Sequence, residues 1–235
     1  MQTVMLGVPA RDPWLCAAFT ESYGATIYQG LASGITVHFQ PLIGQNYVDD
    51  AQNALCAMFL ESECDDLVIM GDDQGWNPEH FVRLCQYDQP IVGVGVRKKT
   101  DTEDYTVALK PRPLYTADGL LPLHKGEGVG SGYLRLRRDA VETMAEKADW
   151  YYLTRCKLDV PNLFERKRHG TSEKGNPCQS SEDFNFCWKA QEAGIQIYVD
   201  PEIDTNHTGW KTWSGNMGEY WRRVNAAEIA AQSAA

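Results

Sequence analysis

Apolar residues occur along this chain in two patterns, and the two alternate. Short continuous apolar runs are typical of strands that are buried on both faces of a sheet. From Tyr47 to Glu61, by contrast, apolar side chains recur at helical spacing and give one apolar face. Strands that alternate with helices predict parallel strands joined by crossover helices. The expected strands are Thr3–Val8, Ile35–Phe39, Leu67–Met70, Ile91–Val96 and Ile195–Val199.

Prolines, glycines and short polar residues predict where the helices begin and end. A proline fits the first turn of a helix, a short polar residue fits its N-cap, and a glycine often follows its last turn. Pro9 is expected to stop the first strand, and Gly24 to follow the first helix. The predicted helices run from Asp12 to about Ser22, from Tyr47 to Glu61, from Pro78 through Cys85, from Arg138 to Ala148, from Ser180 or Ser181 through Ala193, and from Tyr220 into the tail.

Three other segments carry different patterns. Residues 97–127 are rich in Lys, Pro, Asp and Gly, which predicts loops and one hairpin. Tyr133–Arg137 alternates apolar and polar side chains, which predicts a half-exposed strand. Residues 150–177 show no regular pattern and contain the basic cluster Arg166–His169. Loops of this length are usually functional or disordered, and this one could order over bound substrates as a lid.

Size and composition fit one large α/β domain. The chain has 235 residues, of which 43% are hydrophobic, so intrinsic disorder is excluded for most of its length. A net charge of −10 argues against a broad nucleic-acid groove. Its seven cysteines are dispersed and form no CxxC pair, which predicts reduced thiols. With no membrane-spanning run and no signal-peptide pattern, the expected location is the cytoplasm of a bacterial or phage-infected cell.

The acidic turn Gly71-Asp72-Asp73 follows the predicted buried strand Leu67–Met70. Open α/β sheets bind ligands beyond the carboxyl ends of their strands, which is where this turn lies. Two adjacent carboxylates repel each other, and a divalent cation that also bridges to a diphosphate would neutralise them. The same carboxylates could instead cap the following turn, where Gly75 and Pro78 reverse the chain. On spacing alone, both interpretations stay open.

Two further groups carry candidate chemistry. Glu182 and Asp183 stand in the first turn of a predicted helix, where the helix dipole favours carboxylates. They are either ordinary capping residues or include a general base that deprotonates an acceptor hydroxyl. His207 is either a surface imidazole or, if Asp73 binds a metal, a ligand that completes an Mn²⁺ site.

Taken in order, these segments resemble the GT-A-fold glycosyltransferases, in particular family 2-like members from bacteria and phages. The resemblance runs through most of the chain, and its specificity comes from the order and spacing of short motifs. It is carried by Gln52-Asn53, similar to an Arg-Asn pair, by Leu67–Pro78, similar to a strand, an Asp-x-Asp turn and a helix, by Ile91–Lys99, by Gly130–Leu134 with Arg137-Arg138, by Glu182–Cys187, and by His207–Gly209.

This resemblance implies a fold and a domain layout. The fold would be α/β, a single GT-A (Rossmann-like) domain with a mostly parallel central sheet flanked by helices. Residues 1–219 would form the catalytic domain, with a nucleotide-binding half at 1–99 and an acceptor half at 100–219 that includes an irregular loop at 150–180. Residues 220–235 would form a helical tail.

The resemblance also implies roles for individual residues. Asp73 and His207 would hold Mn²⁺ or Mg²⁺, and Asp183 or Glu182 would be the general base. The nucleotide would lie against the loop that follows the first strand. Lys98 and Lys99 would either contact the diphosphate or stay solvated. These nucleotide-binding candidates are Pro9, Arg11, Asp72, Asp73, Lys98 and Lys99.

Two departures from the family pattern change this expectation. Gly71 replaces the first Asp of the Asp-x-Asp motif, and Asp72 occupies its middle position. Either Asp72 takes over the ribose or metal contact, or metal binding is weaker than in the family. Gln52 in place of Arg is a milder departure.

The expected function is metal-dependent transfer of a hexosyl or pentosyl group from a nucleotide sugar, with a UDP-sugar favoured, to an acceptor hydroxyl with inversion. The acceptor stays open among a saccharide, a protein side chain and a modified base in phage DNA, and no membrane partner is expected. The basic cluster at 166–169 would suit nucleic-acid phosphate or be a solvated loop. The alternatives are a catalytically weak nucleotide-sugar-binding module and a nucleotidyltransferase, although no Gly-rich basic loop follows the first strand.

Overall fold

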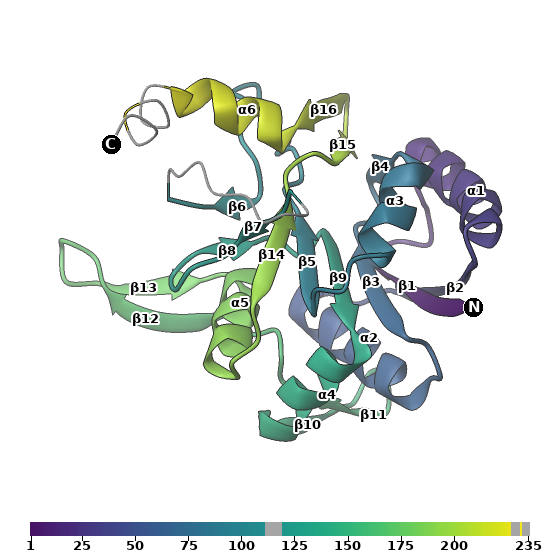
Figure 1. Cartoon of the computed structure of the whole chain (residues 1–235). Coiled ribbons are helices and arrows are strands. Elements are labelled where there is room, and N and C mark those ends of the chain that lie inside the picture. The colour runs from purple at the N-terminus through teal and green to yellow at the C-terminus, as the bar shows by residue number, and fades with distance from the viewer. Residues whose placement is uncertain (111–118, 227–230, 232–235) are drawn as a thin grey trace.

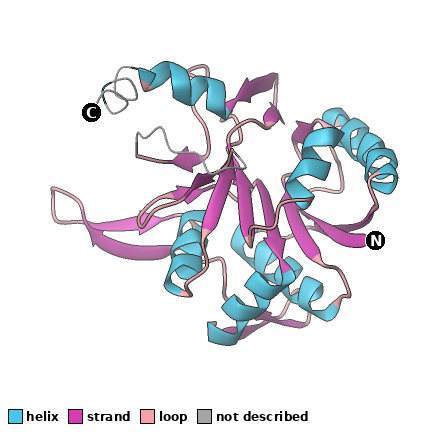
Figure 2. Ribbon diagram, viewed as in Figure 1, coloured by secondary structure: helices cyan, strands magenta, loops and turns pink. Residues whose placement is uncertain are grey.

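The computed structural model describes residues 1–110, 119–226 and 231, and its core is a seven-stranded sheet (Figure 1). Helices cover both faces of this sheet (Figure 2). Its strand order is β2-β1-β3-β9-β5-β14-β7. These strands are β1 Gln2–Ala10, β2 Ile35–Ile43, β3 Asp66–Met70, β5 Ile91–Val94, β7 Leu121–Pro122, β9 Tyr133–Arg137 and β14 Ile197–Asp200. The helices are α1 Ala17–Ala32, α2 Val48–Glu61, α3 Pro78–Cys85, α4 Arg138–Lys147, α5 Glu182–Glu192 and α6 Met217–Val224.

Strand β3 sends alternate side chains into two separate hydrophobic clusters. Leu67 and Ile69 lie in a cluster with buried residues of α2, α4 and α5. Val68 and Met70 lie in a cluster with buried residues of α1 and α3, on the other face. A strand covered on both faces has no polar side, which explains the continuous apolar run. The predicted strand Leu67–Met70 is confirmed.

The sheet is mixed, because β9 runs antiparallel to both of its neighbours, β3 and β5. Three ladders are parallel: β1 with β2, β1 with β3, and β5 with β14. Three are antiparallel: β9 with β3, β9 with β5, and β14 with β7. The α/β class is therefore confirmed, whereas a mostly parallel sheet is not.

Strand β9 was expected to be half-exposed, but it is buried from Tyr133 to Leu136. Its Arg135 is 2% exposed and forms an ion pair with Asp66 of β3, with Nε and Oδ1 2.9 Å apart. Gln2 Nε2 donates a hydrogen bond of 2.5 Å to the other oxygen of Asp66. A buried charge is tolerated when it is paired and hydrogen-bonded. Because Arg135 is paired in this way, β9 can be covered on both faces although its sequence alternates apolar and polar side chains.

The end of the first strand was predicted at Pro9, and this is wrong: β1 continues through Pro9 to Ala10. Strand β3 pairs with β1 only as far as Gly7, whereas β2 pairs along its whole length. Beyond Gly7, β1 is therefore flanked on one side alone. A proline is tolerated there because its missing N–H can face the unpaired side.

Helix α1 lies further along the chain than the predicted segment from Asp12 to Ser22, and it passes through Gly24. Small polar side chains on its inner face accept hydrogen bonds from Trp76. The Trp76 backbone N–H donates to Ser22 Oγ and its Nε1 donates to Thr26 Oγ1, each at 2.9 Å. These tertiary contacts outweigh the low helix propensity of glycine.

The segment 150–180 is not irregular but forms two antiparallel hairpins. Strand β10 (Trp150–Leu153) pairs with β11 (Leu158–Pro161), and β12 (Lys167–Thr171) pairs with β13 (Pro177–Ser180). These strands are too short to show a periodic pattern. Strand β12 is exposed along its whole length and has no apolar face, so hydropathy gave no signal for it.

Three shorter strands form a second sheet of order β16-β15-β4, and a separate pair joins β6 to β8. Their bounds are β4 Gln74–Trp76, β15 Asp204–Thr208, β16 Thr212–Asn216, β6 Val107–Ala108 and β8 Gly128–Val129. The predicted loop region 97–127 therefore contains short paired strands, and residues 111–118 of it lie outside the described part of the chain.

The remaining predicted helices agree with the structure to within a residue or two at their ends. Helices α2, α3, α4 and α5 occupy the expected ranges, and Gly194 follows α5 with a positive φ of 84°. Helix α6 begins at Met217, before the expected Tyr220, and residues 227–230 and 232–235 of the tail are outside the described part. All seven cysteines are unpaired. Among the described helices, none is long and apolar enough to cross a membrane.

Asn53 of α2 anchors the segment between the two hairpins. Its Oδ1 accepts hydrogen bonds from the backbone N–H groups of Leu163 and Phe164, at 3.0 and 2.8 Å. Its Nδ2 donates to the Phe164 carbonyl at 2.8 Å and to the Tyr151 hydroxyl at 3.1 Å. Asn53 is 1% exposed, so water cannot replace these bonds.

We expect Asn53→Ala to lower the free energy of unfolding by about 3 kcal/mol, because it leaves buried backbone groups without partners. Urea denaturation measures this change. Tyr151→Phe keeps the backbone bonds of Asn53 and is expected to cost only about 1 kcal/mol. Equal, small losses in both variants would contradict an anchoring role for Asn53.

Candidate active site

The acidic turn at residues 71–73 joins the end of β3 to β4, and three other segments hold its backbone. The N–H of Gly71 donates to the Gly132 carbonyl at 2.9 Å, just before β9. The N–H of Thr208, at the end of β15, donates to the Asp73 carbonyl at 2.8 Å. The N–H of Cys16, before α1, donates to the Asp72 carbonyl at 3.3 Å. Segments far apart in the sequence therefore meet at this turn.

The side chain of Gln74 explains why residue 71 is glycine. A Cβ on Gly71 would lie 2.9 Å from Gln74 Nε2, and a Cβ on Gly132 would lie 2.6 Å from the same atom. Gln74 is 3% exposed, so its amide is enclosed between the two glycines. An aspartate at position 71, as in the Asp-x-Asp pattern, would collide with this amide. Gln74 did not stand out in the sequence, where a glutamine after two acidic residues gives no signal.

Asp73 lies between two basic side chains, those of Lys99 and His207. Lys99 Nζ forms an ion pair with Asp73 Oδ2. His207 Nε2 lies 3.3 Å from Asp73 Oδ1. Strand pairing explains the second contact, because β15 runs antiparallel to β4 and places His207 opposite Gln74. His207 and one of the two candidate lysines, Lys99, thus converge on the carboxylate of Asp73.

The hydrogen bonds of His207 fix the direction of its ring. Nδ1 lies 2.8 Å from the Arg97 carbonyl oxygen, and since a carbonyl can only accept, Nδ1 carries the proton. Nε2 then faces Asp73: with a proton it donates to that carboxylate, and without one its lone pair is available to a cation. Burial alone would raise the pKa of Asp73, but hydrogen bonds and charges from His207 and Lys99 outweigh it and hold that pKa below its usual value.

Asp72 is adjacent to Asp73, but its pKa is shifted in the opposite direction. Burial raises the pKa of Asp72, and the adjacent charge of Asp73 raises it further, while Lys99 opposes both. Asp12, in the loop after β1, also contributes a repulsive charge. The loop expected to hold the nucleotide base is therefore close enough to the acidic turn to affect it.

Asp183 lies at the start of α5 with one oxygen held and the other directed at a glycine. Its Oδ1 accepts hydrogen bonds from the Phe184 N–H, at 2.8 Å, and from the Ser181 hydroxyl. A Cβ on Gly130 would lie 3.3 Å from its Oδ2. Gly130 is two residues from Gly132, which contacts the acidic turn, so the two glycines are no more than about 7 Å apart. Residues 130–132, the glycine strip, thus connect Asp183 to the acidic turn.

Three other predicted site residues have different partners. Lys98 Nζ binds Asp104 Oδ2 at 2.6 Å, so Lys99 and not Lys98 is the lysine at the turn. Glu182 Oε2 lies 3.5 Å from Arg166 Nε. Pro9 belongs to β1 and pairs with Leu42 of β2.

Arg11 is exposed in the loop that follows β1. Gln52, the substitute for Arg in the family pair, donates a 2.6 Å hydrogen bond to the Ser131 hydroxyl in the middle of the glycine strip. Position 52, noted in the sequence as a departure from the family pattern, thus contacts the glycine strip.

The described side chains do not form a complete metal site. Within the residues that the structure describes, no group of three or more His, Cys, Asp or Glu side chains is placed to hold a metal ion. Asp73 and His207 form a pair of candidate ligands. A substrate or water could supply further ligands.

Comparisons with solved structures show similarities of shape. No family model matches the sequence, and no curated protein matches it. The structure is similar to that of A197 from STIV, with 16% identity and a TM-score of 0.49, over 89% of this chain and 86% of that one. It is also similar to a glycosyltransferase involved in the glycosylation of the major capsid of PBCV-1, with 8% identity and a TM-score of 0.34, over 60% of this chain and 62% of that one. At these TM-scores neither similarity bears on function.

The contact between residue 71 and Gln74 can be tested with a double-mutant cycle. We expect Gly71→Ala to lower the free energy of unfolding by about 1 kcal/mol, because the added methyl group displaces an enclosed amide. In a Gln74→Ala background, the same substitution is expected to cost little. Thermal and urea denaturation of the four proteins measure the coupling. An equal effect of Gly71→Ala in both backgrounds would contradict the steric explanation.

Proposed function

We propose that this protein is a metal-dependent glycosyltransferase, which moves a hexosyl or pentosyl group from a nucleotide sugar to an acceptor hydroxyl. The observation that carries the proposal is the convergence of Asp73, His207 and Lys99 at the end of β3, with Asp183 connected to them by the glycine strip. A carboxylate, an imidazole and an ammonium group suit a metal-bound diphosphate, and an oriented carboxylate suits a general base.

The geometry of Asp73 and His207 fits a divalent cation. A carboxylate oxygen and an imidazole lone pair 3.3 Å apart have the spacing of adjacent ligands, each about 2 Å from one octahedral ion. The hydrogen bond from Nδ1 to the Arg97 carbonyl is the kind of support that orients a histidine ligand. When bound, Mn²⁺ or Mg²⁺ would offset negative charge on the departing nucleoside diphosphate.

Lys99 provides a second positive charge for the diphosphate. In the free protein its ammonium group is paired with Asp73. A bound diphosphate offers it a more strongly charged partner, while Asp73 turns to the cation. Lys98 cannot take this role without leaving Asp104.

Asp183 is better placed than Glu182 to act as the base. Its Oδ1 is held by two hydrogen bonds, which orient the carboxylate and leave Oδ2 to accept a proton. Loss of that proton lets the acceptor oxygen attack the anomeric carbon from the face opposite the diphosphate, which inverts the configuration. Glu182 faces Arg166 instead.

A UDP-sugar is the donor we favour, with its base near Pro9 and Arg11 and its diphosphate at Asp72 and Asp73. The favoured acceptor is a saccharide. A hydroxylated base of phage DNA is a second candidate, because the basic cluster lies on the exposed strand β12, but the net charge of −10 opposes it. A protein side chain is a third. The proposed location is the cytoplasm of a bacterial or phage-infected cell.

The role of Asp183 can be separated from donor binding. We expect Asp183→Asn to reduce kcat by about 10²- to 10⁴-fold, because the amide cannot accept the proton, while UDP affinity stays unchanged. Glu182→Gln is the matched control and is expected to change kcat by less than about 10-fold. Turnover of a UDP-sugar measures both. If Asp73→Asn and Asp183→Asn both retain full turnover, the proposed function is wrong.

The role of Lys99 can be tested against its neighbour by calorimetry. We expect Lys99→Met to weaken UDP binding in the presence of Mn²⁺ by about 10-fold, because it removes one charge-assisted contact. The same variant is expected to bind Mn²⁺ alone more tightly, because Asp73 loses its competing partner. Lys98→Met should match the unmodified protein in both titrations. Identical behaviour of the two variants would contradict a specific role for Lys99.

A further inference from the structure

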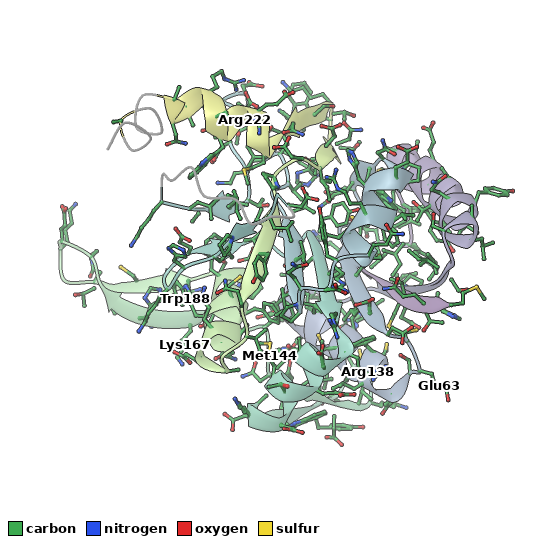
Figure 3. The ribbon with its side chains drawn as sticks, in the orientation of Figure 1. Glu63, Arg138, Met144, Lys167, Trp188 and Arg222 are labelled. Carbon is green, nitrogen blue, oxygen red and sulfur yellow. The ribbon has the colours of Figure 1, made fainter. Side chains whose placement is uncertain are left out.

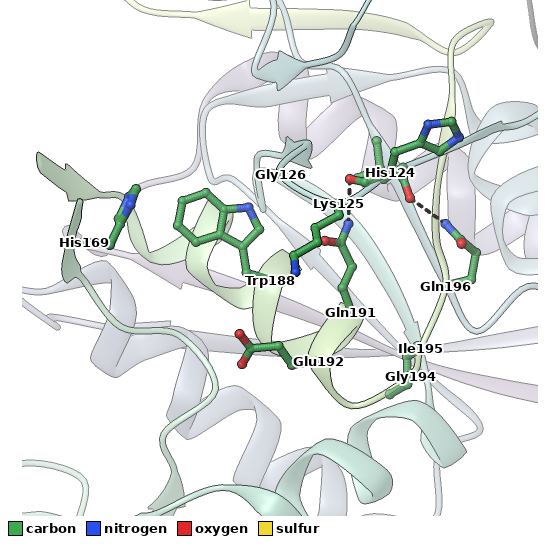
Figure 4. Close-up of a pocket in the computed structure, with 11 residues that line it drawn as sticks. His124, Lys125, Gly126, His169, Trp188, Gln191, Glu192, Gly194, Ile195 and Gln196 are labelled. Carbon is green, nitrogen blue, oxygen red and sulfur yellow. Dashed lines mark hydrogen bonds between the residues drawn. The ribbon is translucent and has the colours of Figure 1, made fainter. Parts of the chain in front are cut away.

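A cavity of about 770 Å³ lies away from the acidic turn, between α5, the loop before β8, the start of β14 and the hairpin strand β12 (Figure 4). It is lined by Leu123–Gly126, His169, Trp188, Gln191, Glu192 and Gly194–Gln196. Figure 3 shows Trp188 on α5 and Lys167 on β12 at the left of the molecule, below Arg222 of α6. The cavity has the size of a small-molecule site.

Hydrogen bonds hold the loop at residues 123–126 in the wall of the cavity, one from α5 and one from the segment before β14. Gln191 Nε2, on α5, donates to the His124 carbonyl at 3.1 Å. Gln196 Nε2, before β14, donates to the Leu123 carbonyl at 2.8 Å. These bonds fix the loop against the helix and the strand, as the dashed lines in Figure 4 show. The cavity is therefore formed before any ligand binds.

An aromatic platform stands in this wall. The Trp188 indole packs edge-to-face against His169, with ring centroids 4.7 Å apart and planes at 88°. Trp188 lies one helical turn after Phe184, which packs against Gly128 of β8. Packing of the preceding turn and the contact with β12 thus hold the indole at the cavity.

The charges at the cavity balance. It contains one ammonium group, from Lys125, and one carboxylate, from Glu192. In the part of the chain that the structure describes, neither side chain has an ion-pair or hydrogen-bond partner. Both can therefore bond to a ligand, but together they favour neither an anion nor a cation.

We propose that this cavity is an accessory binding site for a neutral oligosaccharide. A flat aromatic face suits the apolar face of a sugar ring, and the free ammonium and carboxylate groups suit its hydroxyls. With one ammonium and one carboxylate group in its lining, the cavity favours a neutral ligand over a nucleotide or an acidic polymer.

The cavity is separate from the proposed catalytic site, although α5 contributes to both. Asp183 and Trp188 are five residues apart, so they project about 140° from each other around the helix. One sugar chain therefore does not run straight from one to the other along a single helix face. A polymeric or branched acceptor held at the cavity would instead raise the local concentration of its other ends near Asp183. This role, unlike the binding itself, rests on the proposed function.

The test is a titration of the whole protein with neutral cello-, malto-, manno- and chito-oligosaccharides of two to six units. Binding is measured by calorimetry and by the shifts of the indole N–H signals in NMR. We expect at least one series to bind and to shift the Trp188 signal, and Trp188→Ala to weaken that binding at least about 10-fold. Trp150→Ala removes an exposed tryptophan of β10 and is expected to change nothing. Two further variants, Glu192→Gln and Lys125→Met, leave the aromatic platform intact and should also weaken binding.

Absence of binding across all four series, or binding that survives Trp188→Ala, would overturn the proposal. Preferential binding of an acidic oligosaccharide would reject the neutral class. Calorimetry with UDP and Mn²⁺ on the same samples separates the two proposals. Oligosaccharide binding without UDP binding would retain the cavity and reject the transferase, and the reverse result would reject the cavity alone.

Discussion

Two adjacent carboxylates at the end of a buried strand repel each other, and the surrounding structure is arranged around that charge. Lys99 pairs with Asp73, the ring of His207 is turned toward it, and the pKa of Asp72 is raised by burial and by its neighbour. The free protein thus offsets part of the charge with its own ammonium group. In the proposed function, a divalent cation and a diphosphate would take over this compensation.

The direction of one strand brings the other half of the site to this place. Because β9 is antiparallel to β3, its beginning lies beside the end of β3. The glycine strip that leads into β9 therefore borders the acidic turn, and Asp183 packs against that strip. A parallel strand at this position would carry its preceding loop to the opposite edge of the sheet. The buried pair of Arg135 and Asp66, which joins β9 to β3, accordingly supports the site from the far end of the ladder.

The sequence predicted most of what depends on long apolar patterns. Strands covered on both faces, such as β3, and helices with one apolar face, such as α2, were found nearly to the residue. Errors arose where tertiary contacts decide the outcome. The charge of Arg135 is hidden by its partner Asp66, α1 is held by the bonds of Trp76 to small polar side chains, and the hairpins at 150–180 are too short and too polar for hydropathy to detect.

The same limit applies to the site. The order of the motifs pointed to Asp73, His207 and Asp183, and the structure brings the first two together and connects the third through the glycine strip. The sequence could not distinguish Lys99 from Lys98, because adjacent residues on an irregular segment point in different directions. It also gave no reason for Gly71, which depends on the enclosed amide of Gln74.

The most direct measurement is a crystal structure of the protein with Mn²⁺ and UDP, with anomalous scattering recorded at the manganese edge. We expect one manganese peak, about 2 Å from both an Asp73 oxygen and His207 Nε2 and bonded to the diphosphate, with Lys99 turned from Asp73 to a phosphate oxygen. A nucleotide bound away from the acidic turn, or one bound there with no metal between Asp73 and His207, would contradict this expectation.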